Sequence, residues 1–178
     1  QVDVTILGGL QNILPASVTS DLQNSRSNLV DAYKKSELEE EFGLGIIALS
    51  AVIVDKAEPS EALKANTVWS IGTENPKYLM SSLQVDNFRN GIEVQQEKDI
   101  KAEKGAYFTV QQLTLTANQA KDWWFVAELN QTLTDVNQIK FEIENSTDLK
   151  KTIQLDIDAG TENLIQLAGA SDALQLSN

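Results

Sequence analysis

The chain has 178 residues, and its 14 Lys and Arg against 26 Asp and Glu give a formal net charge of −12. This length suits one domain, or one domain with an appendage. The negative charge argues against nucleic acids and anionic membranes as partners, because both are bound by clustered basic residues. The sequence contains no His and no Cys, which excludes disulfides, nucleophiles activated by His, and ordinary zinc sites.

The sequence also has no apolar run of the roughly 18 residues that a membrane span requires. It shows no signal-peptide pattern, which favours the cytoplasm without fixing the compartment. The chain begins at Gln1 and not at Met, so we expect it to be a piece of a larger protein. No cofactor is expected.

The first 131 residues have the apolar alternation and the turn residues of strands. Residues 2–6 alternate until Gly8 and Gly9, which are expected to break the strand. Residues 27–41 fit a strand or a helix equally well. Residues 46–54 form an apolar run rich in β-branched residues. This run is typical of a strand buried on both faces, with a short core helix as the alternative.

Further strands are predicted at 66–72, 78–83, 106–116 and 122–129. The last two are separated by the short polar stretch 117–121, which predicts a hairpin. Asn90-Gly91 is the strongest tight-turn signal, and residues 95–104 are expected to form a charged loop. We expect the core to be formed chiefly by residues 46–54, 107–115 and 123–129.

Beyond residue 131 the period of the apolar residues becomes helical. Thr132 or Thr134 can cap the first helix, and Ser146-Thr147 is a second N-cap candidate. One apolar stripe then runs through Leu149, Ile153, Ile157, Gly160, Leu164, Leu167, Ser171 and Leu174. If unbroken at Gly160, this helix is about 39 Å long, more than a small sandwich can cover. The sequence thus predicts an antiparallel β-sandwich over residues 1–131 and one or two helices over 132–178.

Two parts of the sequence resemble a known family. The first is DKAEPSEALKANTVWS at 55–70; the second comprises GAYF at 105–108, LTL at 113–115 and WWFVAE at 123–128. They resemble the β-sandwich region of large bacterial carbohydrate-active proteins of the cellobiose phosphorylase and glucoamylase-like kind. In that family a β-supersandwich, similar to galactose mutarotase, is followed by a helical linker and an α/α toroid.

The resemblance implies that the catalytic acid lies in the toroid, which this chain does not include, so no catalytic residue is predicted. It implies a non-catalytic accessory or structural domain of a glycoside phosphorylase or hydrolase, which contributes to carbohydrate binding or to a dimer contact. The expected partners are the missing catalytic domain or a second copy of the chain, bound through the 149–174 helix, and an oligosaccharide.

The candidate carbohydrate-binding residues are Trp124, Glu128 and Asp122, because an indole stacks on a sugar and a carboxylate accepts hydrogen bonds from its hydroxyls. On a strand over 122–129 they share one face. The plainer interpretation is that Trp123 fills the core and Trp124 packs under the terminal helix. Trp69 is expected to belong to the core.

Two acidic clusters are candidates for a catalytic or calcium-binding site: Asp55 with Glu58 and Glu61, and Glu97 with Asp99 and Glu103. A glycosidase needs two carboxylates across a cleft, and neighbouring residues in polar loops do not predict one. No metal site is expected. Two alternative functions stay open: a free-standing β-rich assembly module without a sugar role, and a small enzyme of the mutarotase or epimerase kind. The second usually employs the His that this chain lacks.

Overall fold

The computed structural model describes residues 1–51 and 61–171. By its internal contacts, the chain divides into two compact units, Gln1–Lys140 and Phe141–Asn178. Along the chain the elements are β1 (Val2–Ile13), α1 (Ser20–Ser25), α2 (Ser27–Tyr33), β2 (Lys34–Glu39), β3 (Leu44–Leu49), β4 (Ala65–Ile71), β5 (Lys77–Leu79), α3 (Val85–Arg89), β6 (Asp99–Lys101), β7 (Gly105–Leu115), β8 (Trp124–Gln131), α4 (Leu133–Asn145) and α5 (Leu149–Ala170).

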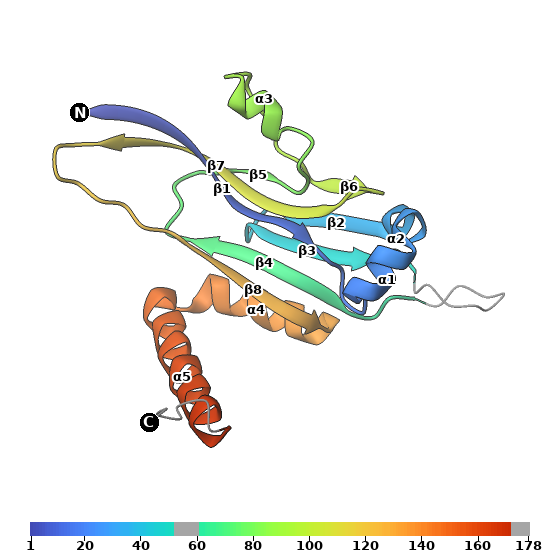
Figure 1. Ribbon diagram of the computed structural model, residues 1–178. Helices are drawn as coiled ribbons and strands as arrows, with labels where there is room; N and C mark the ends of the chain where they lie inside the picture. The colour runs from blue at the N-terminus through green and yellow to red at the C-terminus, as the bar shows by residue number, and fades with distance from the viewer. Residues whose placement is uncertain (52–60, 172–178) are drawn as a thin grey trace, which may run out of the picture. The chain divides into compact units, whose positions relative to one another are not determined.

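The first unit contains two antiparallel sheets that pack face to face (Figure 1). In the described residues, one sheet has the strand order β1-β7-β5 and the other has the order β6-β2-β3-β4-β8. The predicted mainly-β sandwich followed by C-terminal helices is therefore confirmed.

The core lies between the two sheets, as the alternation of side chains along each strand requires. Leu38, Ile47 and Val68 of the five-stranded sheet cluster there with Met80 and Tyr107. At the end of the sandwich where β1 stops, α1 and α2 close the core (Figure 1). A second cluster joins these helices to β3, and its buried members are Val18, Val30 and Leu49.

The start of α4, residues 133–140, covers the face of the five-stranded sheet that is turned away from the other sheet (Figure 1). Val136 and Ile139 are its buried residues. Leu38 faces the core, so Glu39 faces outward, and its carboxylate lies 3.0 Å from the Lys140 ammonium. Thr132 caps the helix: its backbone N–H donates to the Asp135 carboxylate at 2.8 Å, and its hydroxyl accepts a bond from the Asp135 N–H at 3.4 Å.

In the second unit, α5 begins after Asp148, whose side chain accepts a hydrogen bond from the backbone N–H of Lys151. Asp148 is thus the N-cap, in place of the predicted Ser146-Thr147. The helix runs through Gly160 without a break, and the predicted stripe residue Leu174 lies outside the described residues. None of the helices in the described part of the chain is long and apolar enough to cross a membrane.

Two predictions for the first third of the chain are corrected. The strand β1 does not end at Gly8-Gly9 but continues to Ile13. A Cβ at Gly9 would lie 2.1 Å from the carbonyl oxygen of Tyr107, so this glycine lets the two strands approach closely. Residues 27–41, which fit a strand or a helix equally well, contain both: first the helix α2 and then the strand β2.

Strand lengths differ from the prediction elsewhere. The apolar run at 46–54 becomes β3, which starts at Leu44 and ends at Leu49; residues 52–54 lie outside the described residues. The strand predicted at 78–83 is limited to β5, and the predicted loop 95–104 contains the short strand β6. The strand predicted at 66–72 is confirmed as β4.

The predicted hairpin between the last two strands is wrong. Both strands exist as β7 and β8, but β7 pairs with β1 and β5 whereas β8 pairs with β4. The connection between them therefore crosses from one sheet to the other. Short connections favour hairpins in general, but here the long-range pairing of β1 with β7 decides the topology.

Candidate functional site

The three residues predicted to bind carbohydrate lie at the edge of the five-stranded sheet. Asp122 precedes β8 and is exposed, while Trp124 and Glu128 are half-buried in the strand. Trp124 lies opposite Ile71 and Glu128 opposite Thr67 of β4. Four residues of extended chain separate Trp124 from Glu128 by about 13 Å, so the two side chains share a face without converging on one point.

The adjacent residue Phe125 packs against the core. Because successive side chains of a strand point to opposite faces, Trp124 and Glu128 lie on the outer face of the sheet. The other two tryptophans are structural. Trp69 is 5% exposed, which confirms its predicted place in the interior. The Trp123 indole nitrogen lies 3.6 Å from the point where Gly8 would carry a Cβ, so Trp123 packs against β1.

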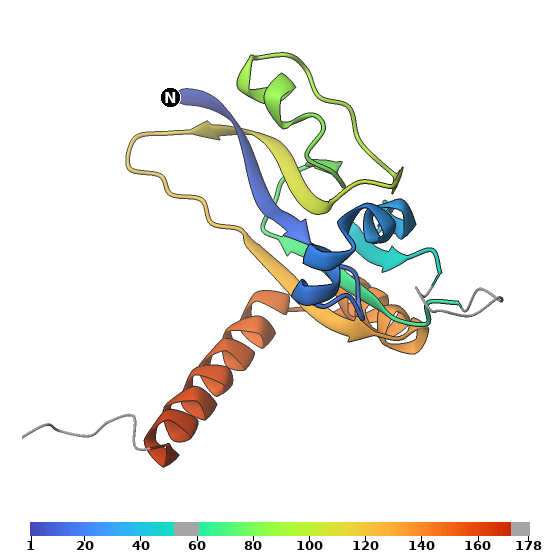
Figure 2. The ribbon, with the colours of Figure 1, turned by 45° about the vertical axis from the view of Figure 1, so that its right-hand side comes forward.

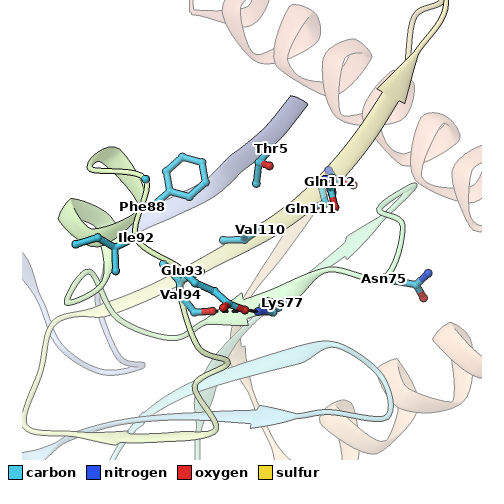
Figure 3. Close-up of a pocket in the computed structure, with 11 residues that line it drawn as sticks. Thr5, Asn75, Lys77, Phe88, Ile92, Glu93, Val94, Val110, Gln111 and Gln112 are labelled. Carbon is cyan, nitrogen blue, oxygen red and sulfur yellow. Dashed lines mark hydrogen bonds and ion pairs between the residues drawn. The ribbon is translucent and has the colours of Figure 1, made fainter. Parts of the chain in front are cut away.

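A groove of about 600 Å³ lies on the outer face of the three-stranded sheet (Figure 3). One wall is the segment around α3, which lies above this sheet in both ribbon views (Figures 1 and 2). The floor is formed by β1, β7 and β5. The groove is lined by Thr5, Asn75, Lys77, Phe88, Gly91, Ile92, Glu93, Val94, Val110, Gln111 and Gln112.

The floor changes from apolar to polar along the strands. Leu7 of β1 pairs with Val110 of β7, and Thr5 pairs with Gln112 two residues further on. Leu7 and Val110 belong to the apolar cluster beneath α3, whereas Thr5 and Gln112 are exposed. The groove therefore offers an apolar surface next to hydrogen-bonding side chains.

The apolar wall comes from Phe88 and Ile92. Phe88 is half-buried and packs against the cluster below it, and Ile92 is 57% exposed. The turn between them is Asn90-Gly91, the strongest turn signal in the sequence. It ends α3 instead of joining two strands: Gly91 has φ +71°, and the Ile92 N–H donates to the Asn87 carbonyl at 2.9 Å.

The charged residues of the groove neutralise each other. The Lys77 ammonium donates to the Glu93 carboxylate at 2.7 Å and to the Val94 carbonyl at 3.2 Å, as the dashed lines in Figure 3 show. The hydrogen bond from Lys77 lowers the pKa of Glu93 below its usual value. Glu93 is therefore ionised at neutral pH and is unsuited to donate a proton.

A buried carboxylate holds the α3 segment in place. Glu97 is 8% exposed and accepts hydrogen bonds from the backbone N–H groups of Met80 and Ser81, both at 2.8 Å. It also accepts from the Ser81 hydroxyl at 3.1 Å and from the Gln84 amide at 2.8 Å. Since a buried charge needs such partners, Glu97 is best explained as the anchor of the groove wall.

The acidic clusters do not assemble a catalytic or metal site in the described part of the chain. Asp55 and Glu58 lie outside the described residues. In the second cluster, Glu97 turns inward while Asp99 and Glu103 are exposed. No group of three or more carboxylates suited to a metal ion occurs among residues 1–51 and 61–171.

Sequence reasoning missed the groove residues Phe88, Ile92 and Gln112. A partial signal was present, because polar and apolar residues alternate over 112–115 at the end of β7. The groove itself depends on the pairing of β1 with β7, whose paired residues Thr5 and Gln112 are more than one hundred positions apart. A pattern within a short stretch of sequence cannot predict a pairing between strands so far apart in the chain.

No family model matches this sequence, and no curated protein matches it.

Proposed function

We propose that this chain is a non-catalytic module that binds carbohydrate, as an accessory domain of a larger carbohydrate-active enzyme. The observation that carries the proposal is the groove on the outer face of the three-stranded sheet. The resemblance of residues 55–70, 105–108, 113–115 and 123–128 to the sandwich region of such enzymes points in the same direction.

The groove has the surface chemistry that a sugar requires. A pyranose ring presents apolar C–H groups on its faces and hydroxyl groups around its edge. Phe88 and Ile92 form an apolar wall for the faces. The amides of Gln112 and Asn75 each supply both donors and acceptors, which suits hydroxyl groups that donate and accept at once.

A neutral sugar fits better than a charged one. The groove's lysine and its carboxylate already form an ion pair at 2.7 Å, so a charged ligand would have to displace one of them. The hydroxyl groups of a neutral oligosaccharide need only the amide and hydroxyl side chains. We therefore expect neutral gluco-oligosaccharides to bind, with Kd values in the millimolar range.

The same geometry argues for binding without catalysis. Glycoside hydrolysis in most families uses two carboxyl groups, one of which has a raised pKa. Among the described residues that line the groove, Glu93 is the single carboxylate, and its pKa is lowered.

Isothermal titration calorimetry with linear gluco-oligosaccharides tests the proposal. We expect saturable binding that Phe88→Ala weakens about tenfold, as the loss of one aromatic contact predicts. Because Phe88 also packs against the sheet, the exposed Gln112→Ala provides a second test that does not threaten folding. Gln95→Ala, an exposed glutamine outside the groove lining, is the matched control.

Binding that is lost in Trp124→Ala and retained in Phe88→Ala and Gln112→Ala would place the sugar on the β8 face and overturn the groove. The absence of binding to any oligosaccharide tested would overturn the carbohydrate role itself.

A second candidate function is assembly through α5. No residue of this helix is buried, although it carries Leu155, Ile157, Leu164, Ile165 and Leu167, each at least half exposed. A helix of this kind gains most of its stability from packing its apolar face. Sedimentation analysis of the wild type and of a double variant, Ile157→Glu with Leu164→Glu, tests this function. Self-association that the double variant abolishes would support it; a wild-type monomer at high concentration would exclude a second copy as the partner.

A further inference from the structure

A second cavity lies in the first unit, at the end of the sandwich where α1 and α2 close the core. Its volume is about 450 Å³. It is separate from the groove, since no residue lines both. It is lined by Asn12, Ile13, Leu14, Gln23, Asn24, Ser27, Asp31, Lys34 and Lys104.

One of the residues that line this cavity is a buried lysine. Lys34 is the first residue of β2 and is only 3% exposed. Burying an ammonium group is costly unless its hydrogen-bond donors find partners. Among the described residues, the Lys34 ammonium, which has three donors, makes one side-chain hydrogen bond, to the Asp31 carboxylate at 2.6 Å.

The cavity carries a net positive charge although the protein is strongly acidic. Lys34 and Lys104 line it together with one carboxylate, Asp31. The pKa of Asp31 is lowered, mainly by the hydrogen bond from Lys34, and the charge of Lys104 acts in the same direction. Asp31 therefore remains ionised at neutral pH, and the second lysine is left to balance a further negative charge.

Gln23, which lines the cavity, carries an unsatisfied acceptor. The amide of Gln23 donates to the Asp31 carboxylate at 3.3 Å. Its oxygen is shielded from solvent and has no hydrogen-bond partner in the described part of the chain. Such an orphaned acceptor suits a hydroxyl group of a ligand.

From these observations we infer that the cavity binds an oxyanion, the phosphate or carboxylate group of a small hydroxylated molecule. The anion accepts hydrogen bonds from the ammonium groups of Lys34 and Lys104, and a neighbouring hydroxyl donates to the Gln23 oxygen. Charge-assisted hydrogen bonds of this kind are the stronger ones in proteins. This site does not depend on the carbohydrate groove.

Amide chemical shifts of the ¹⁵N-labelled chain, titrated with sodium phosphate, test this inference. Sodium chloride of matched ionic strength corrects for salt effects. We expect saturable shifts at Asn24, Ser27 and Lys104, which line the cavity. Separate titrations with glucose 6-phosphate and glucuronate distinguish a phosphate ligand from a carboxylate ligand.

Lys104→Gln removes the exposed lysine without disturbing the core, and we expect it to weaken phosphate binding about tenfold. The matched control is Lys98→Gln, an exposed lysine outside the cavity, which should leave binding unchanged. Lys34→Met tests the buried lysine, provided that its amide spectrum shows a folded chain. The inference is overturned if none of the three anions shifts the cavity amides saturably, or if Lys104→Gln binds as tightly as the wild type.

Discussion

The hydroxyl group of Tyr107 donates a 2.6 Å hydrogen bond to the backbone carbonyl of Gly43. Tyr107 belongs to β7 of the three-stranded sheet, and Gly43 immediately precedes β3 of the five-stranded sheet. The Ser70 hydroxyl lies 3.2 Å from the same tyrosine oxygen. A side chain that is fully buried thus ties the two layers of the sandwich together by a directional bond.

Tyr107→Phe should therefore destabilise the sandwich. The substitution preserves the ring and its packing but leaves the buried Gly43 carbonyl without this donor. An unsatisfied buried group of this kind costs about 1–3 kcal/mol. Urea unfolding measures the change, and a free energy of unfolding equal to that of the wild type would contradict the proposed role of the bond.

The stability of the sandwich should fall at alkaline pH. Burial raises the pKa of both Tyr107 and Tyr78 above the ordinary value of 10.0. Above about pH 10 the unfolded chain releases phenolic protons that the folded chain retains, so ionisation favours unfolding. The contribution of the two neutral phenols to stability is fully present below about pH 10 and is lost progressively above it.

Unfolding by urea at pH 8 to 11 measures this effect, with Tyr107→Phe as the comparison. The variant lacks the Tyr107 proton and should lose less stability between pH 10 and 11 than the wild type. Identical pH dependence in the two proteins would show that Tyr107 does not contribute to it.

Glu97→Gln should weaken both the fold and the groove. The carboxylate accepts from four donors, and an amide in its place brings N–H groups against some of them. Loss of such charge-assisted bonds in a buried site costs about 1.5–3 kcal/mol. Thermal unfolding tests the fold, and oligosaccharide affinity tests the groove wall. An unchanged melting temperature would mean that Glu97 is not an anchor.

The two threonines before α4 should differ in their effect on stability. Thr132→Ala removes the side chain that caps the helix, which typically costs about 1 kcal/mol. Thr134→Ala, an exposed position inside the first turn, should cost little. Chemical denaturation of the two variants compares them, and equal losses would contradict the assignment of Thr132 as the cap.

The sequence predicts those features of the fold that are set by residues close together in the chain. Local patterns suffice for β4 and β7, because β-branched and aromatic residues gather within each of these strands. They also suffice for α4 and α5, whose apolar residues recur at helical spacing. In these strands and helices, the pattern that predicts the element lies within the element's own residues.

Pairing and site geometry are not local in this way. The predicted loop 117–121 is as short as a hairpin loop, yet the connection over 116–123 joins different sheets, because β7 is already flanked by β1 and β5. The same pairing brings Thr5 beside Gln112 in the groove. The sequence alone places Trp124 and Glu128 on one face, because both belong to the same strand. Their binding of sugar stays a prediction.

The most direct test of the carbohydrate-binding proposal is an amide chemical-shift titration of the ¹⁵N-labelled chain with cellotetraose and maltotetraose. The groove account predicts saturable shifts that cluster at Thr5, Phe88, Ile92 and Gln112. Shifts confined to Trp124 and Glu128 of β8, or no saturable shift at millimolar sugar, would contradict it.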